Sequence, residues 1–116
     1  MAELFNEARV LVKSRKLDID KKSVKPKLGK KKRQVENDEG HFSTESIPGE
    51  LEFKLAVTKD YDPDEVDSWV DVPVQVEDVN MGLTFQSEGM TTTEQGQPDK
   101  GWVTVKMAGK PLKRLK

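Results

Sequence analysis

The sequence predicts a mainly β fold with one short helix. Apolar and polar residues alternate over several short segments, which is typical of strands that bury one face. One segment between these strands carries a helix-capping pattern instead. The chain has 116 residues, so we expect a single domain over residues 1–116 with a modest core.

The first expected strand lies near the N-terminus. In residues 7–13, Ala8, Val10 and Val12 occupy alternate positions, although a short helix is an alternative for this segment. Residues 17–19 are the expected hairpin partner of this strand.

The clearest alternation predicts two strands in the middle of the chain. The apolar face of residues 50–58 carries Leu51, Phe53, Leu55 and Val57. The apolar face of residues 70–77 carries Val70, Val72, Val74 and Val76. Pro73 lies in the second run and cannot donate a ladder hydrogen bond, so we expect a sheet edge or a bulge there.

Two further strands complete the expected set. A turn at residues 80–82 leads into residues 83–86, in which Leu83 and Phe85 face inward. Near the C-terminus, the apolar face of residues 101–108 carries Val103, Val105 and Met107.

The expected helix lies within residues 60–69. Asp62 is a suitable N-cap, Pro63 suits the first turn, and Glu65 follows three residues after the cap. Trp69 is expected to pack this helix onto the sheet.

The same stretch partly matches the ligand spacing of a calcium-binding loop. Its acidic residues at the matching positions are Asp60, Asp62, Asp64 and Asp71. Glu65 occupies the position that requires glycine, and the last ligand would be the short Asp71. The helix cap is therefore the favoured interpretation, and no metal site is expected.

Two segments lack apolar periodicity and are expected to be flexible loops in a monomer. They are residues 21–39, which are largely basic, and residues 89–101, which are rich in Thr, Gln and Gly. The basic residues 109–116 are expected to form a C-terminal tail. Long loops are usually functional or disordered, and in a self-assembling protein they can order at an interface.

Charge is distributed unevenly along the chain, although the net charge is -1. Residues 1–40 carry 12 basic and 7 acidic side chains, residues 41–99 carry 2 basic and 14 acidic, and residues 100–116 carry 6 basic and none acidic. The basic ends therefore complement an acidic middle. The opposite charges meet either within one molecule or between neighbouring copies, and the sequence leaves both possibilities open.

The densest group of like charge is the basic run, residues 21–33. Its cations are Lys21, Lys22, Lys25, Lys27, Lys30, Lys31, Lys32 and Arg33. Such a run is compatible with sequence-independent binding of nucleic acid, with a solvated loop, or with an interface loop that meets the acidic middle of a neighbouring copy. No aromatic residue is interleaved to stack on bases, so the nucleic-acid hypothesis rests on charge alone.

Candidate catalytic residues are few. His41 is the single histidine, no cysteine is present, and the common nucleophile, zinc-protease and phosphate-loop motifs are absent. The sequence therefore predicts no enzyme, cofactor or small-molecule substrate, and His41 is expected to be structural. The lack of cysteine and of a signal-like or membrane-spanning apolar stretch predicts synthesis inside the cell and no membrane partner.

Several segments together resemble the tail tube proteins of Mu-like contractile phages and prophages. The similar segments are GHF at residues 40–42, IPGELEF at 47–53, a strand ending at Val57-Thr58, the short acidic helix, the valine-rich strand, and GWVTVKMAGKP at 101–111. The order of these segments carries the resemblance. The N-terminal portion, through the basic run, matches least.

The resemblance implies a β-sandwich or partly open β-barrel with one short helix and long loops. In that family six copies close a ring whose inner wall is a continuous sheet, and the rings stack into a tube. The tube surrounds the tape-measure protein, is wrapped by the tail sheath protein, and conducts double-stranded DNA. The chain would then be part of the virion and be made in the cytoplasm of a bacterial host.

Two groups of residues are candidate contacts under this interpretation. The basic run is expected to contact the adjacent ring, and its expected acidic counterpart comprises Asp60, Asp62, Asp64, Asp67 and Asp71. Glu50 and Glu52 lie on the polar face of their strand and are expected to face the lumen, because a conduit for DNA should not hold phosphates tightly. The alternative function is a small nucleic-acid-binding protein that uses residues 21–33.

Overall fold

A computed structural model describes residues 7–29, 31–35 and 42–115, with the backbone alone for residues 31–35 and 42–46. The described strands are β1 (Ala8–Val12), β2 (Arg15–Lys16), β3 (Lys25–Lys27), β4 (Lys31–Val35), β5 (Phe42–Ser46), β6 (Gly49–Ala56), β7 (Val72–Asp78), β8 (Leu83–Gln95), β9 (Trp102–Gly109) and β10 (Lys113–Arg114). Between β6 and β7 the chain forms a short helix, α1 (Pro63–Asp67). The expected mainly β fold with a short helix is confirmed.

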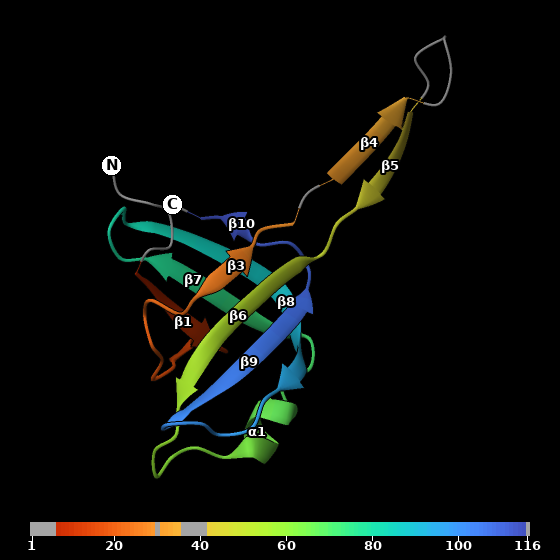
Figure 1. Cartoon of the computed structure of the whole chain (residues 1–116). Coiled ribbons are helices and arrows are strands. Elements are labelled where there is room, and N and C mark those ends of the chain that lie inside the picture. Colours follow the sequence, from red (N-terminus) through yellow and green to blue (C-terminus); the bar gives the residue numbers. More distant parts are fainter. Residues whose placement is uncertain (1–6, 30, 36–41, 116) are drawn as a thin grey trace.

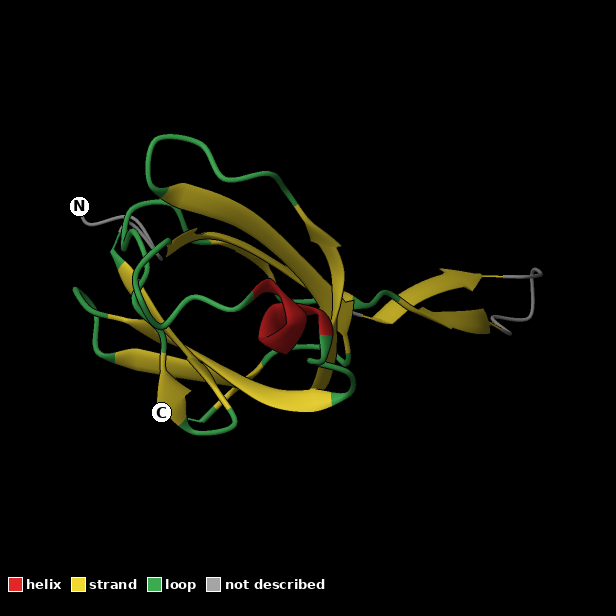
Figure 2. Ribbon diagram, turned by 90° about the horizontal axis from the view of Figure 1, so that it is seen from below, coloured by secondary structure: helices red, strands yellow, loops and turns green. Residues whose placement is uncertain are grey.

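The body of the molecule is one antiparallel sheet that bends over itself. Its described strands follow the order β2-β1-β7-β8-β9-β6-β3, and β10 pairs with β8. The path ends at β2 and β3, so the sheet is not closed into a barrel. Figures 1 and 2 show β1 and β7 on one side of the body, β6 and β9 on the other, and α1 at one end between them.

Alternation along three central strands forms the core between these layers. The buried side chains of β6 are Leu51, Phe53 and Leu55, those of β7 are Val72, Val74 and Val76, and those of β9 are Val103, Val105 and Met107. Burial of an apolar side chain of this size stabilises the fold by about 1.5–3 kcal/mol. The strands expected at residues 50–58, 70–77 and 101–108 are therefore confirmed, apart from their ends.

Two valines expected on these apolar faces lie outside the strands. Val57 is 38% exposed and Val70 is 62% exposed. The strand β7 begins only after Asp71, because this residue has a left-handed φ of 52° that interrupts the extended backbone. The register of β7 against β8 shifts beside Pro73, so the expected bulge is present, but β7 is an interior strand and not an edge.

The N-terminal segment forms a strand and not the alternative helix. The buried residues of β1 are Ala8, Val10 and Val12. Its hairpin partner is β2, which precedes the expected residues 17–19, and of these Leu17 alone extends the pairing, since its N–H donates to the Val10 carbonyl at 3.0 Å. Lys13 and Ser14 both have positive φ, 54° and 67°, which makes the tight two-residue turn between β1 and β2.

The residues that follow β2 cover the outer edge of β6. The Ala56 N–H donates to the Asp18 carbonyl at 2.9 Å, and the Asp20 N–H donates to the Lys54 carbonyl at 3.0 Å. Farther along β6, the strand β3 pairs with the same edge. The backbone N–H and C=O groups at the outer edge of β6 therefore have hydrogen-bond partners along most of the strand.

A corner in β8 joins the two halves of the sheet. The first half of β8 pairs with β7 and the second half pairs with β9, with the change at Met90. A Cβ atom on Gly89 would collide with the Asp71 carboxylate, and one on Gly109 would collide with the Gly89 carbonyl oxygen. The corner therefore depends on glycine at position 109, where the obstacle is backbone, whereas at position 89 the Asp71 side chain can move aside.

The segments expected to be loops contain strands. Residues 21–39 include β3 and β4, residues 89–101 are strand as far as Gln95, and residues 109–116 include β10. In β3, β10 and the second half of β8, polar side chains face solvent or the polar groups of α1, so these strands lack apolar alternation. The interpretation as flexible loops and a free tail was wrong for these strands.

The paired strands β4 and β5 project from the body as a hairpin (Figures 1 and 2). At its base, Gly29 has a φ of +80°, and a Cβ there would lie 2.7 Å from the Ile47 carbonyl oxygen. The Leu112 N–H donates to the Leu28 carbonyl at 2.7 Å, which fastens the C-terminal segment to the same base. His41 lies outside the described residues.

Side-chain hydrogen bonds fasten α1 to the second half of β8. Asp62 caps the helix, as expected, by accepting from the Asp64 N–H at 3.0 Å. Gln95 donates to the Pro63 carbonyl and accepts from the Tyr61 hydroxyl at 2.6 Å. Trp69 is buried, in agreement with its expected packing role. No helix within the described residues is long and apolar enough to cross a membrane.

The corner glycines give a test of this fold. We expect Gly109→Ala to lower the free energy of unfolding by about 1–3 kcal/mol, because the added methyl group has no space against the backbone of β8. Gly96→Ala is the matched control, since the nearest atom to its Cβ would be 3.5 Å away. Urea unfolding of both variants measures the difference, and equal stability would contradict the tight corner.

The Tyr61 contact gives a second test, through pH. Burial raises the pKa of the Tyr61 hydroxyl above its ordinary 10.0, and the nearby carboxylates of Asp67 and Asp62 raise it further. The unfolded chain therefore loses this proton at lower pH than the folded chain, so the stability contributed by Tyr61 is complete below pH 10.0 and is lost as pH rises through the folded pKa. We expect Tyr61→Phe to lose less stability than the wild type between about pH 9.5 and 11, measured by urea unfolding. Parallel curves for the two proteins would contradict this.

Candidate self-assembly surface

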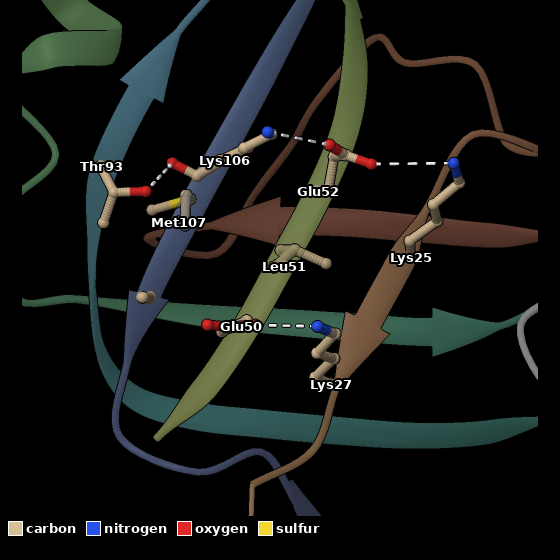
Figure 3. Close-up of a pocket in the computed structure, with 9 residues that line it drawn as sticks. Lys25, Lys27, Glu50, Leu51, Glu52, Thr93, Lys106 and Met107 are labelled. Carbon is tan, nitrogen blue, oxygen red and sulfur yellow. Dashed lines mark hydrogen bonds and ion pairs between the residues drawn. The ribbon is translucent and has the colours of Figure 1, made fainter. Parts of the chain in front are cut away.

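One face of the sheet, over β3, β6, β9 and the second half of β8, carries side chains of both charges (Figure 3). We call it the charge-paired face, and its charged members are Lys25, Lys27, Glu50, Glu52, Glu94 and Lys106. Because the opposite sides of β6 and β9 are buried in the core, alternation directs these side chains outward. All of them except Glu94 line a shallow groove along the strands.

The ion pairs of this face run across the strands. The Lys27 ammonium lies 3.4 Å from the Glu50 carboxylate. The Glu52 carboxylate lies between two cations, 3.8 Å from the ammonium of Lys25 and 3.7 Å from that of Lys106. Lys106 in turn lies 3.4 Å from Glu94. Each carboxylate of this face therefore has a lysine beside it.

Glu50 and Glu52 lie where the sequence places them, on the polar face of their strand. The side chain of Glu50 is 50% exposed and that of Glu52 is 32% exposed. The sequence reasoning did not foresee their lysine partners, because it could not say which strands would be neighbours of β6. The alternating pattern of residues 101–108 did put Lys106 on a polar face.

The basic run does not form one loop. Lys21 and Lys22 are exposed in a turn, and Lys25 and Lys27 belong to β3. Lys31, Lys32 and Arg33 belong to β4, and Lys30 lies outside the described residues. The run is thus divided between the body and the projecting hairpin, and its two β3 lysines have carboxylate partners.

The acidic stretch divides between two places: Asp60, Asp62, Asp64 and Asp67 lie in or next to α1, at the end of the body remote from the hairpin (Figure 1), and Asp71 lies beside Gly89 at the corner of β8. Asp62 caps the helix, and the Asp67 carboxylate accepts from the Gln95 side-chain amide at 3.0 Å. Asp60, Asp64 and Asp71 are exposed. Among the ion pairs of the described side chains, none joins these five aspartates to Lys21, Lys22, Lys25 or Lys27.

The ion pairs among the described residues show where the basic ends of the chain meet its acidic middle. Each of them joins a cation from one of the basic ends to a carboxylate of the acidic middle, as in the pair between Arg15 and Glu65 at 2.7 Å. Opposite charges therefore meet within one molecule, at least in part. Exposed pairs of this kind contribute about 0–1 kcal/mol each, so their main effect is on surface potential and not on stability.

Solved structures of similar fold come from contractile systems. The chain is similar to a chain in the PVC sheath/tube terminator of an extracellular contractile injection system, with a TM-score of 0.71 and 10% sequence identity. The similarity covers 100% of this chain and 98% of the other. The anti-feeding prophage tube terminating cap gives a TM-score of 0.65 at 7% identity, covering 100% of this chain and 93% of that one. A chain of the PVC sheath-tube complex gives 0.62 at 11% identity, covering 97% and 89%. At such identities the likeness shows the fold alone.

Comparison by sequence gives the family. No curated protein matches the chain. Residues 1–114, almost the whole chain, match the family described as phage tail tube protein, in agreement with the expected resemblance. The chain therefore belongs to the phage tail tube protein family, a family of structural tail components.

Proposed function

We propose that this chain is the subunit of a contractile tail tube, in which six copies form a ring and the rings stack. Membership of the tail tube family supports the structural role, and the similar folds from contractile injection systems support the type of tail. The subunit has no catalytic task in this proposal. It is made in the cytoplasm of a bacterial host and ends in the virion tail, with the tail sheath protein outside the tube and the tape-measure protein inside it.

The projecting hairpin is the observation that carries the assembly proposal. The strands β4 and β5 pair only with each other among the described strands, and they extend away from the body (Figure 2). A two-stranded hairpin alone is marginally stable at best in water, so such an element gains most from a partner surface. We infer that the hairpin, which contains Lys31, Lys32 and Arg33, contacts the adjacent ring.

The acidic stretch is the proposed counterpart of the hairpin. Apart from Asp71, it lies around α1, at the end of the body remote from the hairpin in Figure 1, which suits a head-to-tail contact between rings. Asp60 and Asp64 are exposed there and have no cation partner among the described ion pairs. Opposite charge on the two surfaces would speed their association and favour the correct register.

The charge-paired face is the proposed wall of the lumen. A wall that conducts double-stranded DNA must not bind phosphates tightly, and cations hold phosphates by releasing counterions. Here the lysines at positions 25, 27 and 106 each have a carboxylate within 4 Å, which lowers their capacity to do so. The same neutralisation disfavours the alternative of a nucleic-acid-binding protein that uses residues 21–33.

Electron microscopy with a hairpin-deleted variant tests the assembly proposal. Residues 30–46 are replaced by a short Gly-Ser linker, which can span the gap because Gly29 lies against Ile47. The wild type at high concentration is expected to form stacked six-fold rings in negative stain. The variant is expected to keep its far-UV circular dichroism and to form single rings, because stacking has lost its contact.

Light scattering and a salt-titrated DNA-binding assay complete this test. Wild-type protein that stays monomeric and binds DNA with a steep salt dependence would contradict the tube proposal and favour the alternative function. Normal tubes from the hairpin-deleted variant would contradict the role of the hairpin and leave the tube proposal standing.

A lumen variant tests the placement of the charge-paired face. Replacing Glu50 and Glu52 with Lys removes the carboxylate partners of Lys25 and Lys27 and one of the two partners of Lys106, and it adds two cations. The face should then bind phosphates and hold DNA in the tube. We expect particles to assemble and to eject their DNA at least about tenfold more slowly, because each added phosphate contact releases counterions and strengthens DNA binding. The control is Glu77→Lys with Glu88→Lys, which changes the net charge equally on the other half of the sheet. Equal ejection rates would show that the face does not line the lumen.

A further inference from the structure

A single row of alternating charge crosses all four strands of the charge-paired face. Lys25 on β3 lies opposite Glu52 on β6, which lies opposite Lys106 on β9, which lies opposite Glu94 on β8. Register partners on the same face of adjacent antiparallel strands are direct neighbours, and the ion pairs follow this order. The row therefore begins with a cation at one edge and finishes with an anion at the other.

The two ends of the row have the greatest capacity for another partner. Glu52 and Lys106, in the middle, each contact an opposite charge on both sides, and their side chains are 32% and 48% exposed. Lys25 and Glu94, at the ends, are 77% and 64% exposed, and each has one ion pair among the described residues. The ends thus present opposite charges at opposite edges of the same wall.

We propose that this row continues from copy to copy, with Glu94 of one subunit paired to Lys25 of the next. This inference rests on the proposed ring, in which the walls of neighbouring subunits lie edge to edge. A head-to-tail ring contact joins two different edges of the same chain, and here those edges carry complementary charge. The contact would be made by the long side chains on the outward face, where Lys106 already lies 3.4 Å from Glu94, while α1 keeps its place at the edge of β8.

The helix side of β8 leaves Glu94 accessible for this contact. The segment around α1 binds the inward-facing Thr92, whose hydroxyl donates to the Val66 carbonyl at 2.8 Å and whose N–H donates to the Trp69 carbonyl at 2.9 Å. Glu94 instead lies with Lys106 on the outward face. The helix and the proposed neighbour therefore use different sides of the strand.

The neighbouring row on the same face provides a matched control. Lys27 lies opposite Glu50, which lies opposite Ala108, which lies opposite Thr91. Lys27 is 79% exposed and has one ion pair, 3.4 Å from Glu50, so it resembles Lys25 in both respects. Its row, however, has no charge at the β8 edge, and so it offers no partner to the next copy.

Charge reversal and charge exchange test the proposal. We expect Lys25→Glu and Glu94→Lys each to raise the protein concentration needed for ring formation by at least about tenfold at low salt, because like charges then meet between copies. The exchanged variant, Lys25→Glu with Glu94→Lys, should return to within about threefold of the wild type. Lys27→Glu should also stay within about threefold, since its row has no charged partner across the boundary.

The exchanged variant separates contacts between copies from contacts within one chain. It places Glu beside Glu52 and Lys beside Lys106, so both pairs within the chain are as unfavourable as in the two single variants. A row that acted only within one chain would therefore make the exchanged variant assemble worst, and this result would overturn the proposal. Equal damage from Lys27→Glu and Lys25→Glu would overturn it too. Failure of the wild type to form rings would instead contradict the proposed function itself.

Discussion

The close approach of the β8 and β9 backbones at the corner of β8 governs the shape of this subunit. At Gly109 the two backbones lie too near for a side chain, and at Met90 the strand leaves β7 and joins β9. One sheet can therefore supply both a layer of β1 and β7 and a wall of β9, β6 and β3. The edge of β8 that β7 leaves is covered by α1, through the hydrogen bonds of Thr92 and Gln95.

The composition is consistent with this architecture. Only 34% of the residues are hydrophobic and 35% are charged, which suits a thin core between two layers with much exposed polar surface. On the charge-paired face, charges of both signs alternate across the strands instead of separating into patches. Opposite charges at such short spacing largely cancel beyond about one Debye length, whereas at short range each charge acts individually.

The parts of the fold that follow from local rules were predictable. Strict alternation identified β6, β7 and β9, and the Asp62-Pro63 pattern identified α1, because burial of one face and capping need only neighbouring residues. The turn at Lys13 and Ser14 escaped prediction because these residues adopt positive φ without glycine. The second half of β8 also escaped, since the polar residues around Thr92 face α1 and solvent and leave no apolar alternation.

For the candidate site, the supply of charge follows from the amino-acid sequence. Glu50 and Glu52 share one strand face, cations are concentrated at the two ends of the chain, and the middle is acidic. Which of these charges meet depends on the fold, because antiparallel register brings Lys25, Glu52 and Lys106 together from segments far apart in the chain. Periodicity along a strand depends on neighbours in sequence, whereas the order of strands in a sheet depends on how the whole core packs.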